Sequence, residues 1–272
     1  MADDEKLRPM LPSFVAAPEF VERAREFRAA GLPVAPAKPA ATVMLLRDSA
    51  DGLEVFMIRR QVSMRFAGGM HVFPGGGVDP ADRDGRDTDG ALVTAAIRET
   101  FEESGVLLAS EAPADPAGSA PHADPADPAA LEADRIALVE HRIALDSVLA
   151  RHGLVAQPTW LRPWSRWITP DFEPRRYDTL FFVALARPGQ EARDMGGESD
   201  AAEWIAPAKA LAAQAKHEWL LMPPTATTLR ELLPFSDAAD VFDAASARDL
   251  TPRHADIDLD ADPPVFFFRT TR

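Results

Sequence analysis

Three glutamates at helical spacing are the feature of this sequence that most limits its fold. They lie in residues 98–106, Arg-Glu-Thr-Phe-Glu-Glu-Ser-Gly-Val, downstream of a glycine-rich segment at residues 73–77, Phe-Pro-Gly-Gly-Gly, which is expected to form a turn. If the segment before Gly105 is helical, positions i, i+3 and i+4 are neighbours on its surface. One edge of the helix therefore carries Glu99, Glu102 and Glu103.

The rest of this segment predicts how the helix is held. Ile97 and Phe101 fall on the opposite side from the glutamates and form an apolar stripe for a core. Gly105 suits the left-handed position that ends a helix, and either Asp87 or Asp89 can cap its start. The helix therefore has a core face and a chemical face.

The chemical face predicts a bound cation. Two carboxylates about 4 Å apart repel each other by roughly 4 kcal/mol at an effective dielectric constant near 20. A cation among three of them relieves that repulsion, and a ligand set made only of oxygen favours magnesium or manganese. The alternative is a solvated acidic helix face without a ligand.

The glycine-rich segment and the helix together resemble the signature of the Nudix hydrolases, which cleave diphosphates joined to a nucleoside. This resemblance implies that Glu99, Glu102 and Glu103 hold the metal ions. It also implies that Arg98 orients the carboxylates, with Glu102 at i+4 from it. Gly75 and Gly76 are expected to bring the backbone close to the metal or a substrate phosphate.

The signature departs from the common Nudix pattern in one place. Nudix proteins usually carry a glutamate where this chain has Asp82, and residues 83–97 then stretch the distance to Arg98 by eight residues. The insert at 83–89 is polar and contains glycine, which is typical of a surface loop. Asp82, Asp87, Asp89 or no residue takes the place of the missing glutamate.

Arginines before the glycine-rich segment carry information about the substrate. Arg60, Arg65 and Gly69 stand at spacings that resemble the motif of Nudix enzymes that hydrolyse coenzyme A. Arginines beside the catalytic segment can bind phosphate groups, including a 3′-phosphate, in bidentate fashion. The alternative is that they are ordinary charges at a strand end.

Two residues further along the chain are added to the candidate site. Glu198 precedes Trp204 by six residues, where mutator-type Nudix enzymes carry a loop glutamate that binds metal or accepts a proton. Arg176 lies in a segment that also resembles the coenzyme A branch and is expected to contact substrate phosphate. The alternative is that Arg176 is a loop arginine that faces water.

Composition excludes several classes of function. The chain has 272 residues, a net charge of −14 and no cysteine. An acidic chain is a poor match for nucleic acid or an anionic membrane surface, since both favour Lys and Arg. The absence of cysteine excludes disulfides and thiolate sites. We expect a protein of the cytoplasm that binds a small-molecule nucleoside diphosphate substrate. A homodimer is a possible assembly.

Hydrophobic patterning predicts the regular elements. Strands are expected at 41–47, 53–60, 70–73, 159–168, 177–186, from 203, and at 265–269. Helices are expected at 19–30, before Gly105, and at 130–152, 207–216, 224–233 and 237–247.

The resemblance implies an α/β (α+β) Nudix fold, a mixed β-sheet sandwiched between helices. Residues 1–40 are expected to form an N-terminal helix and a Pro/Ala linker, and residues 41–272 a single Nudix domain. Within that domain, 111–152 is a Pro-rich and helical insertion that covers the site or builds a dimer interface. Residues 207–272 form a helical C-terminal extension.

The implied activity is metal-dependent hydrolysis of a diphosphate. The favoured substrate is coenzyme A or acyl-CoA, cut to 3′,5′-ADP and 4′-phosphopantetheine. The alternatives are a nucleotide sugar, a dinucleoside polyphosphate or an oxidised nucleotide, or a Nudix fold that binds nucleotides without catalysis.

Overall fold

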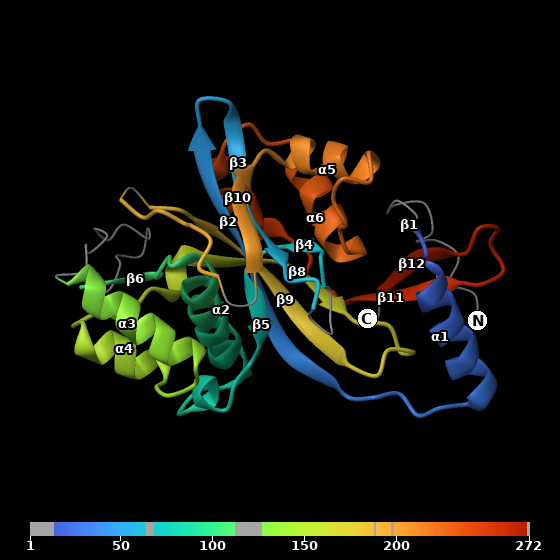
Figure 1. The fold of residues 1–272 in the computed structure, drawn as a ribbon, viewed down its shortest axis with the longest axis horizontal. Helices are drawn as coiled ribbons and strands as arrows, with labels where there is room; N and C mark the ends of the chain where they lie inside the picture. The colour runs from blue at the N-terminus through green and yellow to red at the C-terminus, as the bar shows by residue number, and fades with distance from the viewer. Residues whose placement is uncertain (1–13, 64–67, 112–126, 188, 197–198, 271–272) are drawn as a thin grey trace.

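The computed structural model describes residues 14–63, 68–111, 127–187, 189–196 and 199–270. In these residues a large mixed sheet lies between two groups of helices (Figure 1). Strand β2 runs parallel to β9 and antiparallel to β3, so both kinds of pairing meet at the centre of the sheet. The expected mixed sheet between helices is confirmed.

The main sheet has the order β1-β12-β11-β8-β9-β2-β3-β10, with β4 on β3 and β5 on β2. Its strands are β1 (Phe14–Val15), β2 (Ala37–Ser49), β3 (Gly52–Arg60), β4 (His71–Val72), β5 (Gly75–Gly77), β8 (Leu161–Ile168), β9 (Arg176–Leu185), β10 (Ser199–Ile205), β11 (Arg253–Asp258) and β12 (Val265–Thr270). A separate pair joins β6 (Ala109–Ser110) to β7 (Val155–Ala156).

The central strands are apolar on both faces because helices cover both faces of the sheet. Along β2, Val43 and Leu45 point into one core, whereas Met44 and Leu46 point into the other. This is the alternation that a strand imposes on successive side chains. The sheet therefore separates two hydrophobic cores.

The helices divide between these two cores (Figure 1). On the first lie α2 (Thr88–Ser104), α3 (Pro128–Val139) and α4 (Leu145–Arg151). On the second lie α5 (Pro207–Ala215), α6 (Pro223–Leu232) and α7 (Ala238–Ala244). Short 3-10 turns stand at Ala81–Arg83, Pro158–Trp160 and Ala245–Ala247.

The first and the last described elements meet at one end of the sheet. Helix α1 (Pro18–Ala30) packs Val21 and Ala24 against Ile257 of β11 and Phe266 of β12. Strand β1 pairs with β12 in the same region. The sequence patterns predict α1 and β12 but not β11, and they place a linker where β2 has already begun at Ala37.

The expected helix over 130–152 is wrong as a single element. It is two helices, because the chain reverses after Val139 and His141 takes a left-handed conformation with φ 54°. The Pro-rich stretch before α3 falls mostly on residues 112–126, outside the described part of the chain.

Other boundaries shift by a few residues. Strand β10 begins at Ser199, ahead of the expected start at Glu203, and β8 begins at Leu161, after a 3-10 turn that contains Pro158. Among the helices of the described residues, none is long and apolar enough to cross a membrane.

Candidate active site

The glycine-rich segment is a strand and not the expected turn. In β5, Gly75, Gly76 and Gly77 pair with Thr42, Ala41 and Ala40 of β2. A Cβ atom on Gly75 would lie 2.5 Å from the Ala41 carbonyl oxygen, and one on Gly76 would lie 2.3 Å from Glu99 Oε1. Glycine is required at position 75 because the backbone of β2 lies against it, and at position 76 a larger residue would displace the Glu99 carboxylate.

Helix α2 begins and ends at the residues that its sequence predicts. The Asp87 side chain accepts a hydrogen bond from Gly90 N, which caps the first turn. Gly105 ends the helix with φ 75°, and its N–H donates to the Phe101 carbonyl. The cap residue Asp87 belongs to the insert at 83–89, so α2 begins within that insert.

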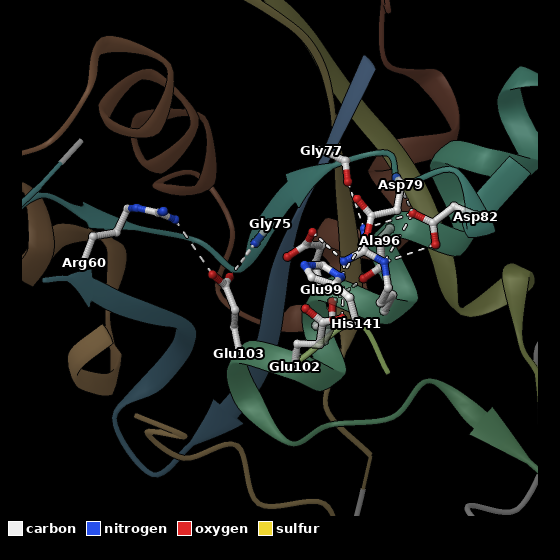
Figure 2. A network of polar contacts seen from close by, with 12 residues as sticks. Arg60, Gly75, Gly77, Asp79, Asp82, Ala96, Glu99, Glu102, Glu103 and His141 are labelled. Atoms are coloured by element: carbon white, nitrogen blue, oxygen red, sulfur yellow. Dashed lines mark hydrogen bonds and ion pairs between the residues drawn. The ribbon is translucent and has the colours of Figure 1, made fainter. Parts of the chain in front are cut away.

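The two faces of α2 are as expected. Ile97 and Phe101 are buried in the core. Glu99, Glu102 and Glu103 lie toward β5 and the segment that follows it (Figure 2). A single helix thus anchors itself in the core and presents three carboxylates.

Arg98 connects the parts of this site. Its guanidinium is buried and donates two hydrogen bonds to Asp82 Oδ2, one at 2.9 Å from Nη2 and one at 3.2 Å from Nε. Nη2 also donates to the Gly77 carbonyl at 2.8 Å. Nη1 lies 2.8 Å from Glu99 Oε1 and 3.3 Å from Glu102 Oε1. Arg98 thus contacts Asp82, Glu99 and Glu102 at once (Figure 2).

Asp82, one of the alternatives for the missing glutamate, forms an ion pair with Arg98. Its side chain is almost fully buried against Arg98, and Oδ2 also accepts a hydrogen bond from Asp79 N at 2.9 Å. Asp87 is occupied as the cap of α2. Asp82 lies in the 3-10 turn Ala81–Arg83, and this turn places its carboxylate against the Arg98 guanidinium.

Glu103 is held at the first residue of β5. Its Oε2 accepts a hydrogen bond from Gly75 N at 2.8 Å, and its Oε1 lies 3.8 Å from Arg60 Nη1 (Figure 2). Of the arginines expected to bind substrate, Arg60 therefore lies beside the carboxylates.

The carboxylates on α2 are held in an environment that disfavours their charge. Burial, together with the charge of Glu102, raises the pKa of Glu99 to about 7, although Arg98 opposes the shift. Burial also raises the pKa of Glu102. Burial alone would lower the pKa of Arg98, but its hydrogen bond to Asp82 and the surrounding charges raise it. A second cation among these groups would stabilise their charged forms.

The donor set fits magnesium or manganese in chemistry, since it is made only of oxygen. Within the described residues, no three His, Asp or Glu side chains gather closely enough to hold an ion. Arg98 lies against Glu99 and Glu102, while Glu103 is turned toward Gly75. The fourth expected ligand, Glu198, and the expected substrate residue Arg65 lie outside the described residues.

Arg176 does not lie at this site. Its buried guanidinium donates to the carbonyl groups of Ala35, Thr169 and Pro170 and pairs with Asp171. These groups satisfy the side chain at the start of β9, so its role here is to hold loops together. The expected phosphate contact of Arg176 stays a prediction.

Sequence reasoning missed Asp79 and His141. Asp79 follows β5 and pairs with His141 across 3.3 Å, from Oδ2 to Nδ1. The spacing of 62 positions between them gives no sequence signal, and a lone histidine is usually a surface residue. Only the folding of the insertion onto α2 brings them together (Figure 2).

Comparisons with known proteins agree with this geometry. The family model described as NUDT19 Nudix domain matches residues 84–232. The human acyl-coenzyme A diphosphatase NUDT19 is 27% identical over 243 residues, covering 71% of this chain and 64% of that protein. The chicken protein of the same name is 32% identical over 171 residues, covering 59% of this chain and 45% of that protein. The chain thus spans less than two thirds of the length of either.

A solved structure shares the fold more completely. The crystal structure of a NUDIX hydrolase from Alicyclobacillus acidocaldarius superposes with a TM-score of 0.65 at 31% identity, covering 80% of this chain and 99% of that one. The family model, this solved structure and the mixed sheet agree, and the chain belongs to the Nudix hydrolase family. Within that family it belongs to the branch defined by the NUDT19 Nudix domain.

Proposed function

We propose that this protein hydrolyses the diphosphate of a nucleoside diphosphate-linked compound with the help of a divalent metal ion. The observation that carries the proposal is the buried Arg98, which binds Asp82 and holds Glu99 and Glu102 beside the glycine strand. Such a costly arrangement of charge is typical of a functional site.

Each residue has a proposed role. Glu99, Glu102 and Glu103, with Glu198 from the loop before β10, would hold magnesium or manganese. A bound ion neutralises phosphate charge and lowers the pKa of a coordinated water. Arg98 fixes the carboxylates, and Gly75 N holds Glu103. Because Gly75 and Gly76 have no Cβ atom, β5 lies close to both β2 and the Glu99 carboxylate.

Coenzyme A or its acyl esters are the proposed substrate, with 3′,5′-ADP and 4′-phosphopantetheine as products. The support is the name of the relatives, acyl-coenzyme A diphosphatase, together with Arg60. Arg60 Nη1 lies 3.8 Å from Glu103, so the side chain can reach a phosphate group next to the carboxylates.

The substrate proposal is tested by comparing coenzyme A with its dephospho analogue. Arg60→Ala and Arg65→Ala should weaken binding of coenzyme A more than that of the analogue, by about 1.5 to 3 kcal/mol for a lost charged hydrogen bond. Arg59→Ala is the matched control, because Arg59 is paired with Asp200 and partly exposed. Equal losses on both ligands would contradict a contact to the 3′-phosphate.

A nucleotide-binding protein without catalysis is the second candidate. The missing glutamate favours it, whereas the buried ion pair between Asp82 and Arg98 supports the catalytic proposal. A metal-dependent assay of product release separates the two. The cytoplasmic location and the homodimer stay predictions, because no feature of the described residues tests them.

A further inference from the structure

His141 occupies a backbone position that normally belongs to glycine. It follows α3, where its N–H donates to the Leu138 carbonyl and the Arg142 N–H donates to the Ala137 carbonyl. This pair of bonds ends a helix and requires a left-handed residue, which is φ 54° at His141. A histidine there is disfavoured relative to glycine. His217 takes the same conformation after α5, so the surroundings of the ring decide whether the His141 side chain has a role.

The ring of His141 lies at the edge of the carboxylate cluster (Figure 2). Nδ1 is 3.3 Å from Asp79 Oδ2, and the histidine side chain is 70% exposed. The backbone N–H of Asp79 is bound by Asp82, which in turn binds Arg98. Asp79 thus ties His141 to the Arg98 network. In the described part of the chain, Nε2 has no hydrogen-bond partner.

The surroundings of the ring are strongly anionic. Asp79, Glu99 and Glu102 lie close enough that the charge of Asp79 bears on both glutamates and that of His141 bears on Glu102. Arg98 cannot serve a ligand from solvent, because it is buried and bonded to four groups. A phosphate group that reaches this edge needs an exposed hydrogen-bond donor from the protein, and the ring of His141 offers one.

We propose that Asp79 and His141 form a pair that binds a phosphate group of the diphosphate substrate. Asp79 orients the ring through Nδ1, and Nε2–H donates a hydrogen bond to a phosphate oxygen. The inference rests on the proposed function of the same site. It gives the insertion between β6 and β8 a task, which is to supply a substrate contact from outside the Nudix signature.

Replacing His141 with glycine separates this role from a structural one. His141→Gly removes the ring and also the strained side chain, so we expect the melting temperature to rise by about 1 to 3 °C. We expect kcat/KM to fall about 10- to 100-fold, as for a lost charged hydrogen bond. Binding of inorganic pyrophosphate with magnesium, measured by calorimetry, should weaken by a similar factor.

The chain contains a matched control at the end of α5. His217 has φ 62°, its N–H donates to the Gln214 carbonyl, and the Glu218 N–H donates to the Ala213 carbonyl. His217→Gly makes the same backbone change away from the carboxylates. It should raise the melting temperature similarly and leave turnover and pyrophosphate binding unchanged.

A double-mutant cycle tests the pair itself. Asp79→Ala should lower kcat/KM in the wild-type background and change it less than twofold in the His141→Gly background, because the two act as a unit. Unchanged turnover and pyrophosphate binding in His141→Gly would overturn the inference and leave the proposed function intact. If the wild-type protein cleaves no diphosphate, the proposed function fails, and pyrophosphate binding still decides the role of His141.

Discussion

Arg98 joins four groups through one guanidinium, and Asp82 is its most buried partner. Because removing one member of a buried ion pair leaves an uncompensated charge, such changes are strongly destabilising. Asp82 lies in the 3-10 turn at Ala81–Arg83, ahead of the eight-residue extension of the signature, and this turn brings its carboxylate to Arg98.

Asp82→Asn should lower the free energy of unfolding by about 3 kcal/mol and reduce turnover, since Arg98 would lose its charged partner. Chemical denaturation and steady-state kinetics measure the two effects. Asp87→Asn is the control, because asparagine caps a helix as well as aspartate. Similar losses of stability and turnover in both variants would show that the Asp82–Arg98 pair contributes no more than an exposed helix cap.

His71 predicts a pH dependence of stability at the same scale. Burial, helped by Arg59, lowers the pKa of His71 to about 4, and the ring stacks on Trp219 at 3.7 Å. The unfolded chain then binds more protons than the native one between about pH 6.5 and 4, so stability falls as the pH is lowered through this range.

A change of His71→Phe keeps a ring on Trp219 but removes the titration. From the shift in pKa, the wild-type protein should lose about 3 kcal/mol more than the variant between pH 7 and 4. Urea denaturation at the two pH values measures this difference. Parallel loss of stability in both proteins would mean that His71 is protonated in the native state without penalty.

Among the elements, α3 holds the end of α2 as well as carrying His141. Arg135 is buried, pairs with Glu132 and donates to the Glu102 carbonyl at 2.7 Å. It thus fixes the turn of α2 that presents Glu102 and Glu103. The insertion therefore packs α3 against the C-terminal turn of α2.

Arg135→Met should lower kcat by ~10-fold and destabilise the fold by about 1 to 3 kcal/mol, because the Glu102 carbonyl loses its donor. Kinetics and thermal unfolding provide the readouts. Arg142→Met is a suitable control, since Arg142 is exposed and pairs only with nearby Glu140 among the described residues. A normal kcat in Arg135→Met would argue against this contact as a positioning device.

Sequence patterns predicted α2 well because its signals are local: a cap at Asp87, an apolar stripe and Gly105. They failed where tertiary contacts decide. Three glycines in a row indicate a turn, yet Gly75–Gly77 is a strand because β2 supplies partners for it. β11 was missed because its charged residues weaken the strand pattern. The reversal at His141 lacks the glycine that usually marks a helix end.

For the whole molecule, metal binding should couple to stability. The raised pKa of Glu99, about 7, means that the metal-free native state binds more protons than the unfolded chain between about pH 4.5 and 7. Stability without metal therefore falls as the pH rises through this window, and a bound cation should restore it. Magnesium should raise the melting temperature more at pH 8 than at pH 5.

Differential scanning calorimetry with magnesium and with a chelator tests this coupling. In Glu102→Gln the effect of magnesium should shrink at both pH values, because a ligand charge is lost. Equal stabilisation at pH 5 and pH 8 would mean that the ion binds elsewhere than at the α2 carboxylates.

Product analysis by mass spectrometry tests the central claim most directly. The wild-type protein and Glu102→Gln are incubated with magnesium and a panel containing coenzyme A, an acyl-CoA, a nucleotide sugar and a dinucleoside polyphosphate. We predict 3′,5′-ADP and a 4′-phosphopantetheine as the fastest-formed products, with turnover lower by ~10² or more in the variant. Equal product formation in both proteins, or no cleavage of any diphosphate by the wild type, would contradict the account.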